Sequence, residues 1–177
     1  MPKVYWYNHN PVEKTGTKAQ AGRLWLRFSI VGIGWIRENE PTQPLDLSQF
    51  VSRVAQDCSS DAERNTFNRF KPSFEQMIAT SAGDIVCIEV KGVVYAGQLR
   101  ISNGTLWHYQ QPSPSVDQTG AHVYAHVDQF LPIGSVDMYQ PLPIRRAVNL
   151  VTQQADRITA ALSHAQQLVI DQNRAAK

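Results

Sequence analysis

Two short apolar runs near the middle of the chain, separated by a tight turn, predict a β-hairpin. Residues 85–88 and 93–101 are rich in the β-branched and aromatic residues that favour strands. Lys91-Gly92 lies between the two runs and supplies the turn. Gly97 interrupts the second run, which indicates a bulge, a bend, or a close approach of another backbone or a ligand. We expect this hairpin to be the centre of a small β-barrel.

Segments of alternating polarity or aromatic character predict the other strands. Along residues 24–30, apolar positions alternate with Trp25 and Arg27, so one face should lie in the core and the other should show an aromatic ring and a cation. Asn103-Gly104 tolerates positive φ and predicts a type I′ turn, after which the chain should pair back on the hairpin. The remaining strands are expected at residues 4–7, 106–109, 121–127 and 129–133, and the last of them should close the barrel.

Apolar residues at helical spacing separate the second strand from the third. A first helix is expected to begin near Asp46, a residue that caps helices, and to end at Ser59-Ser60. A second helical pattern passes through Phe67. Pro72 is suited to the first turn of a third short helix, which leads the chain to Gly83-Asp84 and the central hairpin.

The chain changes in character after Pro141 and Pro143. The apolar residues beyond them recur at intervals of three and four and predict one helix from about residue 145 to 174. They are Val148, Val151, Ala155, Ile158, Leu162, Ala165 and Val169. We therefore divide the chain into a barrel domain, residues 1–140, and a helical extension, residues 141–177. The apolar seam needs a cover, either the barrel itself or a second chain, and a homodimer is the simplest form of the latter.

Composition limits the class of protein more than it identifies the function. The 177 residues carry a net charge of only +2, so the total charge does not mark a nucleic-acid-binding protein. The cations are unevenly placed, because six of them and a single acid, Glu13, fall between Lys3 and Arg37. A solvated surface explains that excess as well as a binding site does. No apolar run approaches the length of a membrane span, so we expect a soluble cytoplasmic protein.

The residues that carry metal or catalytic chemistry do not form a recognisable site in the sequence. Cys58 and Cys87 lack the spacing of a disulfide framework or a zinc site and are expected to be reduced core residues. His122 and His126 are four apart on a predicted strand, about 13 Å along an extended chain, which is too far to share a metal. Asp84 is best explained as a turn carboxylate that accepts backbone hydrogen bonds. We expect no enzyme activity, no cofactor and no metal.

The order of these motifs resembles the PUA-like superfamily and, within it, the EVE-like domains that occur alone or fused to modification-dependent restriction enzymes. The matching segments lie between about residues 5 and 133. They are Trp25 with Gly32-Ile33-Gly34-Trp35, a helical insert, Phe74-x-x-Met77 before Gly83-Asp84-Ile85-Val86, Tyr95-Ala96-Gly97-Gln98-Leu99, an aromatic strand, and Tyr124-x-His126. Relatives often place an arginine soon after this histidine, where the present chain has Val127 and Asp128.

The resemblance implies an α+β fold, a PUA/EVE-like curved β-barrel with inserted short helices, to which this chain adds the long C-terminal helix. It also implies a pocket for a single, often modified, base of DNA or RNA, read by aromatic walls and a few polar groups. The candidate ligand-binding residues are Trp25, Arg27, Trp35, Trp107 and His108. For any one of the tryptophans, core packing is the competing explanation.

A second hypothesis assigns the chain to another class. The barrel is then a scaffold for a protein-interaction or inhibitor protein of phage or mobile-element origin, and the C-terminal helix binds the partner. The third hypothesis is an enzyme that acts on nucleic acid, and no catalytic motif in the sequence supports it.

Overall fold

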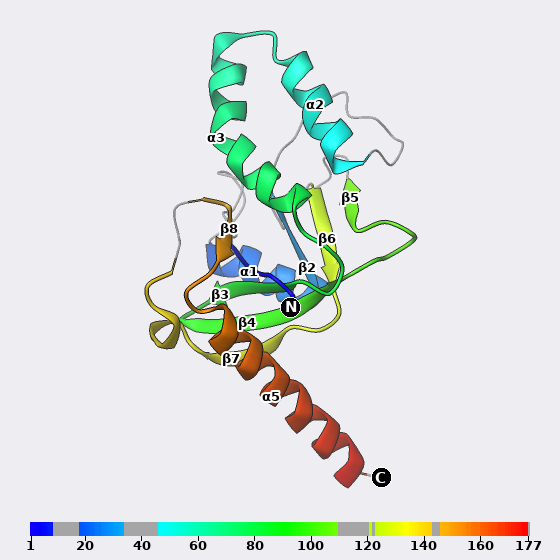
Figure 1. Cartoon of the computed structure of the whole chain (residues 1–177), viewed down its shortest axis with the longest axis vertical. Helices are drawn as coiled ribbons and strands as arrows, with labels where there is room; N and C mark the ends of the chain where they lie inside the picture. The colour runs from blue at the N-terminus through cyan, green and yellow to red at the C-terminus, as the bar shows by residue number, and fades with distance from the viewer. Residues whose placement is uncertain (9–17, 34–45, 110–120, 122, 143–145, 177) are drawn as a thin grey trace.

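The computed structural model describes residues 1–8, 18–33, 46–109, 121, 123–142 and 146–176. Its architecture is α+β, as predicted: a mixed sheet curls into a half-barrel that stays open, with helices on both of its faces (Figure 1). The described strands follow the order β2-β6-β4-β3-β1-β8, while β5 pairs with β6 and β7 pairs with β4. The predicted closure of the barrel is therefore replaced by a curled, open sheet.

The described elements have the following bounds. The strands are β1 (Val4–Tyr7), β2 (Ile30–Ile33), β3 (Ile85–Val90), β4 (Val93–Arg100), β5 (Trp107–Tyr109), β6 (Val123–Val127), β7 (Leu131–Ser135) and β8 (Val148–Val151). The helices are α1 (Lys18–Phe28), α2 (Leu47–Asp57), α3 (Asp61–Ile78), the 3-10 helix η1 (Val136–Tyr139) and α5 (Ala155–Ala175). As predicted, the helical insert α2–α3 lies between the second and third strands.

The central hairpin is confirmed. β3 and β4 pair in antiparallel register from Ile85↔Gln98 to Val90↔Val93. The turn residues Lys91 and Gly92 have φ values of 53° and 81°, in the left-handed region that a two-residue hairpin turn requires. Of the alternatives predicted at Gly97, the structure shows the close approach of another backbone, that of Gln129.

The strand predicted at residues 24–30 is wrong over most of its length, because residues 18–28 form α1. Ala21 and Trp25, four residues apart on one face of α1, are both buried at 1% exposure. This helical period determines the structure, although the same segment also alternates at period two. Ser29, with φ 51°, follows the end of the helix, and only then does β2 begin.

The helical insert differs from the prediction in one respect. Asp46 caps α2 as expected, since its carboxylate accepts a hydrogen bond from the Ser48 backbone N–H at 2.8 Å. Ser60 and Glu63 form a reciprocal capping box at the start of α3. The third helix predicted to begin at Pro72 does not exist, because Pro72 lies inside the 18-residue α3. The buried residues Phe67 and Phe74, seven apart, keep one face of α3 in the core across the proline.

The strand at residues 107–109 does not pair back on the hairpin as predicted. Asn103 and Gly104 do adopt positive φ, 50° and 79°, but the turn they make is closed by a single bridge between Ser102 and Thr105. β5 then continues along the edge of β6 that the end of β4 has already joined. β4 and β5 therefore lie end to end along β6, and this arrangement builds the surface described below.

The chain after residue 146 contributes both a strand and a helix. The helix predicted from about residue 145 begins only at Ala155, and Val148 and Val151 belong to β8, which pairs antiparallel with β1. The start of α5 packs against β7, β1 and β4, where Ile158 and Leu162 are buried at 0% and 2% exposure. Beyond the sheet, α5 continues away from the body of the protein to the C-terminus (Figure 1).

Two apolar cores lie on opposite faces of the sheet. Tyr5 and Tyr7 of β1 point into the first core, which also holds buried residues of α1, α2 and α3. Val4 and Trp6 point into the second, together with the buried residues of η1 and α5. Because both faces are covered, all four residues of β1 are buried, and the strand shows no polar alternation. None of the described helices is both long and apolar enough to cross a membrane.

Candidate functional site

The structure separates two of the residues predicted to share a binding surface. Trp25 is a buried core side chain of α1, whereas Arg27, two residues further along the helix, is exposed. The Arg27 guanidinium carbon lies 5.7 Å from the centre of the Phe28 ring. Trp35, the third residue predicted from this part of the chain, lies outside the described residues.

Trp107 and His108 are adjacent in β5 and point to opposite faces of the sheet. Trp107 is 7% exposed and belongs to the core shared with α1, α2 and α3. His108 is half-buried on the other face. Of the predicted site residues that the structure describes, His108 is the one that lies in a cluster of accessible polar and aromatic groups.

The ring cluster consists of His108, Tyr124 and His126. His108 and Tyr124 are direct partners across β5 and β6, and their rings stack with centroids 5.3 Å apart and an interplanar angle of 26°. The His126 ring stands edge-on to both, 5.1 Å from His108 and 5.5 Å from Tyr124. All three side chains are half-buried, so parts of their rings face solvent.

The local sequence of β6 explains why this cluster forms. Val123, Ala125 and Val127 alternate with Tyr124 and His126 along the strand, and the three apolar residues are fully buried in the first core. Period-two alternation then forces the two ring-bearing residues onto the opposite face. The register with β5 adds His108 to the same face.

Arg100 adds a positive charge beside the ring cluster. It is the register partner of His126 across β4 and β6 and is exposed at the end of β4. Its Nε lies 3.8 Å from Oδ1 of Asp128, whose side chain is also largely exposed. Such an exposed pair is weak, since solvent screens it, and the guanidinium keeps donors for another partner.

Burial and charge keep the two imidazoles neutral near pH 7. Partial burial lowers the pKa of His108 below its usual value, and the neighbouring His126 lowers it further. Partial burial also lowers the pKa of His126, with Arg100 as a second cause. A neutral imidazole offers one hydrogen-bond donor, one acceptor and a ring face.

His108 carries an unsatisfied polar atom. Its Nε2 is buried and has no hydrogen-bond partner among the residues that the structure describes. An imidazole nitrogen in this state costs free energy that a polar partner would recover.

The described residues contain no group of side chains arranged to bind a metal ion. No three residues among the described His, Cys, Asp and Glu are grouped so that they could hold a metal ion. Cys58 and Cys87 are both buried and are not joined in a disulfide, as predicted, and burial raises the pKa of the Cys87 thiol far above its usual range. Asp84 is the predicted structural carboxylate and accepts hydrogen bonds from the backbone N–H groups of Lys3 and Ser81.

Sequence reasoning found part of this surface. Tyr124 and His126 were placed on a predicted strand, and His126 was considered as a metal ligand, but neither was predicted to bind a ligand. Their alternation with apolar residues along that strand could have placed both on the face opposite the core. No local sequence pattern indicates that Arg100 belongs to this surface, because its position beside His126 depends on the pairing of β4 with β6.

Comparison with known proteins adds no relative: no family model, no curated protein and no solved structure matches this chain. The resemblance to PUA-like and EVE-like domains therefore stays a prediction.

Proposed function

We propose that this chain is a non-enzymatic recognition module that binds a base or modified nucleotide of DNA or RNA. The binding surface is the ring cluster of His108, Tyr124 and His126 together with Arg100. The observation that carries the proposal is the gathering of three half-buried rings and one exposed guanidinium on the same sheet face. These are the groups that stack on bases, bond their edges and contact phosphates.

Each group of this surface has a defined contribution to binding. Stacking of a base on an aromatic side chain contributes about 1–3 kcal/mol. Neutral imidazoles add hydrogen bonds to a base edge without the desolvation cost of a buried charge. The guanidinium of Arg100 supplies a charge and hydrogen-bond donors for a phosphate oxygen.

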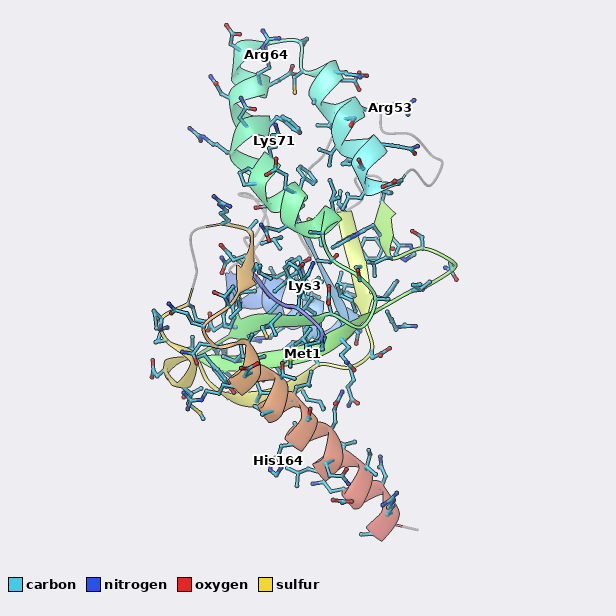
Figure 2. The ribbon with its side chains drawn as sticks, in the orientation of Figure 1. Met1, Lys3, Arg53, Arg64, Lys71 and His164 are labelled. Carbon is cyan, nitrogen blue, oxygen red and sulfur yellow. The ribbon has the colours of Figure 1, made fainter. Side chains whose placement is uncertain are left out.

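The proposal is tested by fluorescence polarisation, which measures the affinity for labelled oligonucleotides with and without modified bases at a fixed salt concentration. Tyr124→Ala removes one ring and should weaken binding about 5- to 150-fold, the equivalent of 1–3 kcal/mol. His164→Ala is the matched control, because His164 is exposed on the part of α5 that extends away from the sheet (Figure 2). Equal affinity of wild type and Tyr124→Ala would show that the ring cluster is not the binding surface.

Association through α5 is the second candidate function, and exposed apolar residues favour it. Leu168 is 48% exposed and Ile170 is 44% exposed on the part of the helix that extends beyond the sheet. We propose that a second copy of the chain covers this part of α5. Light scattering over a range of concentrations should show a dimer that Leu168→Ser weakens, with the exposed polar neighbour Gln167→Ser as the control.

A further inference from the structure

The spacing of the rings in the cluster limits how a base is held. A base inserted between two rings needs a gap of about 7 Å, twice the optimal separation of about 3.5 Å between stacked carbon atoms. His108 and Tyr124 are nearly parallel, but their centroids are only 5.3 Å apart. The two rings already stack on each other, so the space between them does not admit a base.

The third ring leaves no wider gap. His126 is tilted by 76° to His108 and by 79° to Tyr124, with centroids 5.1 and 5.5 Å away. An edge-on ring at this distance is in contact with both neighbours and forms no parallel wall opposite either of them. The three rings therefore form one closed group that presents its outward surfaces.

We propose that the base stacks on the outward surface of this ring cluster and that the ligand is a single-stranded segment of nucleic acid. The inference rests on the proposed function and concerns the same residues. In a duplex, both faces of each base are covered by its neighbours, whereas a single strand exposes base faces to a protein surface. A half-buried ring group on a sheet face is a stacking platform for such a strand, and its three rings lack the two parallel walls that hold a flipped base.

The charge beside the rings agrees with a single-stranded ligand. Among the residues that the structure describes, Arg100 is the cation that strand register places on this face, next to His126. One phosphate contact to a single strand gives a slope of about −0.7 in a plot of log K against log salt. The platform is thus expected to bind mainly through stacking, with a shallow dependence on salt.

Fluorescence polarisation with three probes of one sequence tests this inference on the full chain. The probes are a single strand, a blunt duplex, and a duplex with one extrahelical base, each made as DNA and as RNA. The single strand should bind at least about tenfold more tightly than either duplex, in line with the loss of one stacked base. The DNA and RNA arms show which backbone is preferred.

Variants separate stacking from charge. Tyr124→Leu keeps most of the side-chain volume but removes the π-system, and it should weaken single-strand binding about 5- to 150-fold without changing the salt slope. Tyr124→Phe keeps the ring and should bind within about twofold of wild type. Arg100→Gln should make the salt slope shallower by about 0.7. Thermal unfolding of each variant shows whether the fold is retained.

The outcomes distinguish the two proposals. Preference for the duplex with the extrahelical base would overturn the single-strand inference and leave base recognition standing. Equal binding of single strand and blunt duplex would also overturn it, because phosphate contacts alone would then explain the affinity. No binding of any of these probes, together with no binding of the modified oligonucleotides described above, would overturn the proposed function itself.

Discussion

The carbonyl oxygen of Gln129 occupies the place that a side chain on Gly97 would need. A Cβ on Gly97 would lie 2.5 Å from that oxygen and would also collide with the side chain of Val127. At this point the neighbour of β4 changes: residues 93–96 pair with β7, and Leu99 and Arg100 pair with β6. The close approach at Gly97 lets the chain pass from β6 to β7 along one edge of β4, and it thereby holds Arg100 beside His126.

Gly97→Ala should therefore destabilise the fold through a steric clash. We expect the free energy of unfolding in urea to fall by about 1–3 kcal/mol, the usual cost of overpacking. Gly104→Ala is the contrasting control, because nothing lies within 4 Å of its Cβ position and only its φ of +79° opposes the substitution. That strain costs about 1 kcal/mol. A smaller loss for Gly97→Ala than for Gly104→Ala would contradict the account of the strand crossing.

Local signals in the sequence predicted the parts of the fold whose causes are local. The turn at Lys91-Gly92 and the cap at Asp46 depend on residues within four positions of each other, and both are in the structure. The hairpin follows from its own apolar runs. These elements needed no knowledge of the remainder of the chain.

Errors arose where two local patterns competed or where pairing was long-range. Residues 24–30 fit period two, yet Ala21 and Trp25 also fit the helical period, and burial of Trp25 in the core favoured the helix. The pairing of β5 with β6, and of β8 with β1, joins segments far apart in sequence. The candidate site depends on long-range strand pairing, since the register of β4, β5 and β6 brings His108, Tyr124 and Arg100 to one face.

Truncation of buried side chains on α5 should destabilise the whole protein. Ile158→Ala and Leu162→Ala each remove a side chain packed in the core beneath β7, and each should lower the free energy of unfolding by about 2–5 kcal/mol. Gln166→Ala, at an exposed position on the part of the helix beyond the sheet, should change it by less than about 0.5 kcal/mol. Urea denaturation of the three variants provides the measurement.

The contrast between the buried start of α5 and its exposed end also determines where the chain tolerates truncation. Removal of residues 163–177 should leave a folded protein, because both buried residues of α5 remain. Removal from residue 145 onwards should not, since it also takes away β8 and its hydrogen bonds to β1. A folded protein after the longer deletion would show that β8 and α5 are dispensable additions to the sheet.

Asp84 should stabilise the fold through its hydrogen bonds. The side chain is 7% exposed, and its two oxygens accept the backbone N–H groups of Lys3, at 2.8 Å, and Ser81, at 2.9 Å. Asp84→Asn would turn one acceptor into a donor that faces an N–H group, at a cost of about 1–3 kcal/mol in the free energy of unfolding. Asp128→Asn, at an exposed ion pair, should cost no more than about 1 kcal/mol. Equal effects of the two variants would contradict this role.

The histidines of the ring cluster should make stability depend on pH. The pKa of both His108 and His126 is lower in the folded protein than the value near 6.5 expected in the unfolded chain, chiefly because of burial. Below pH 6.5 the unfolded chain therefore binds more protons than the folded protein. The stability contribution is fully present above pH 6.5 and is lost as the pH falls through the lower, folded pKa values.

Arg100 should tune this response through His126. Because the guanidinium is a second cause of the lowered pKa of His126, Arg100→Gln should raise that pKa toward its usual value, as measured by NMR titration of the imidazole protons. The same variant should lose less stability between pH 7.5 and pH 5.5 than wild type does. His126→Gln should also flatten the pH dependence, and by more than the matched substitution His164→Gln on α5. An unchanged pKa of His126 in the Arg100→Gln variant would show that the two side chains do not interact electrostatically.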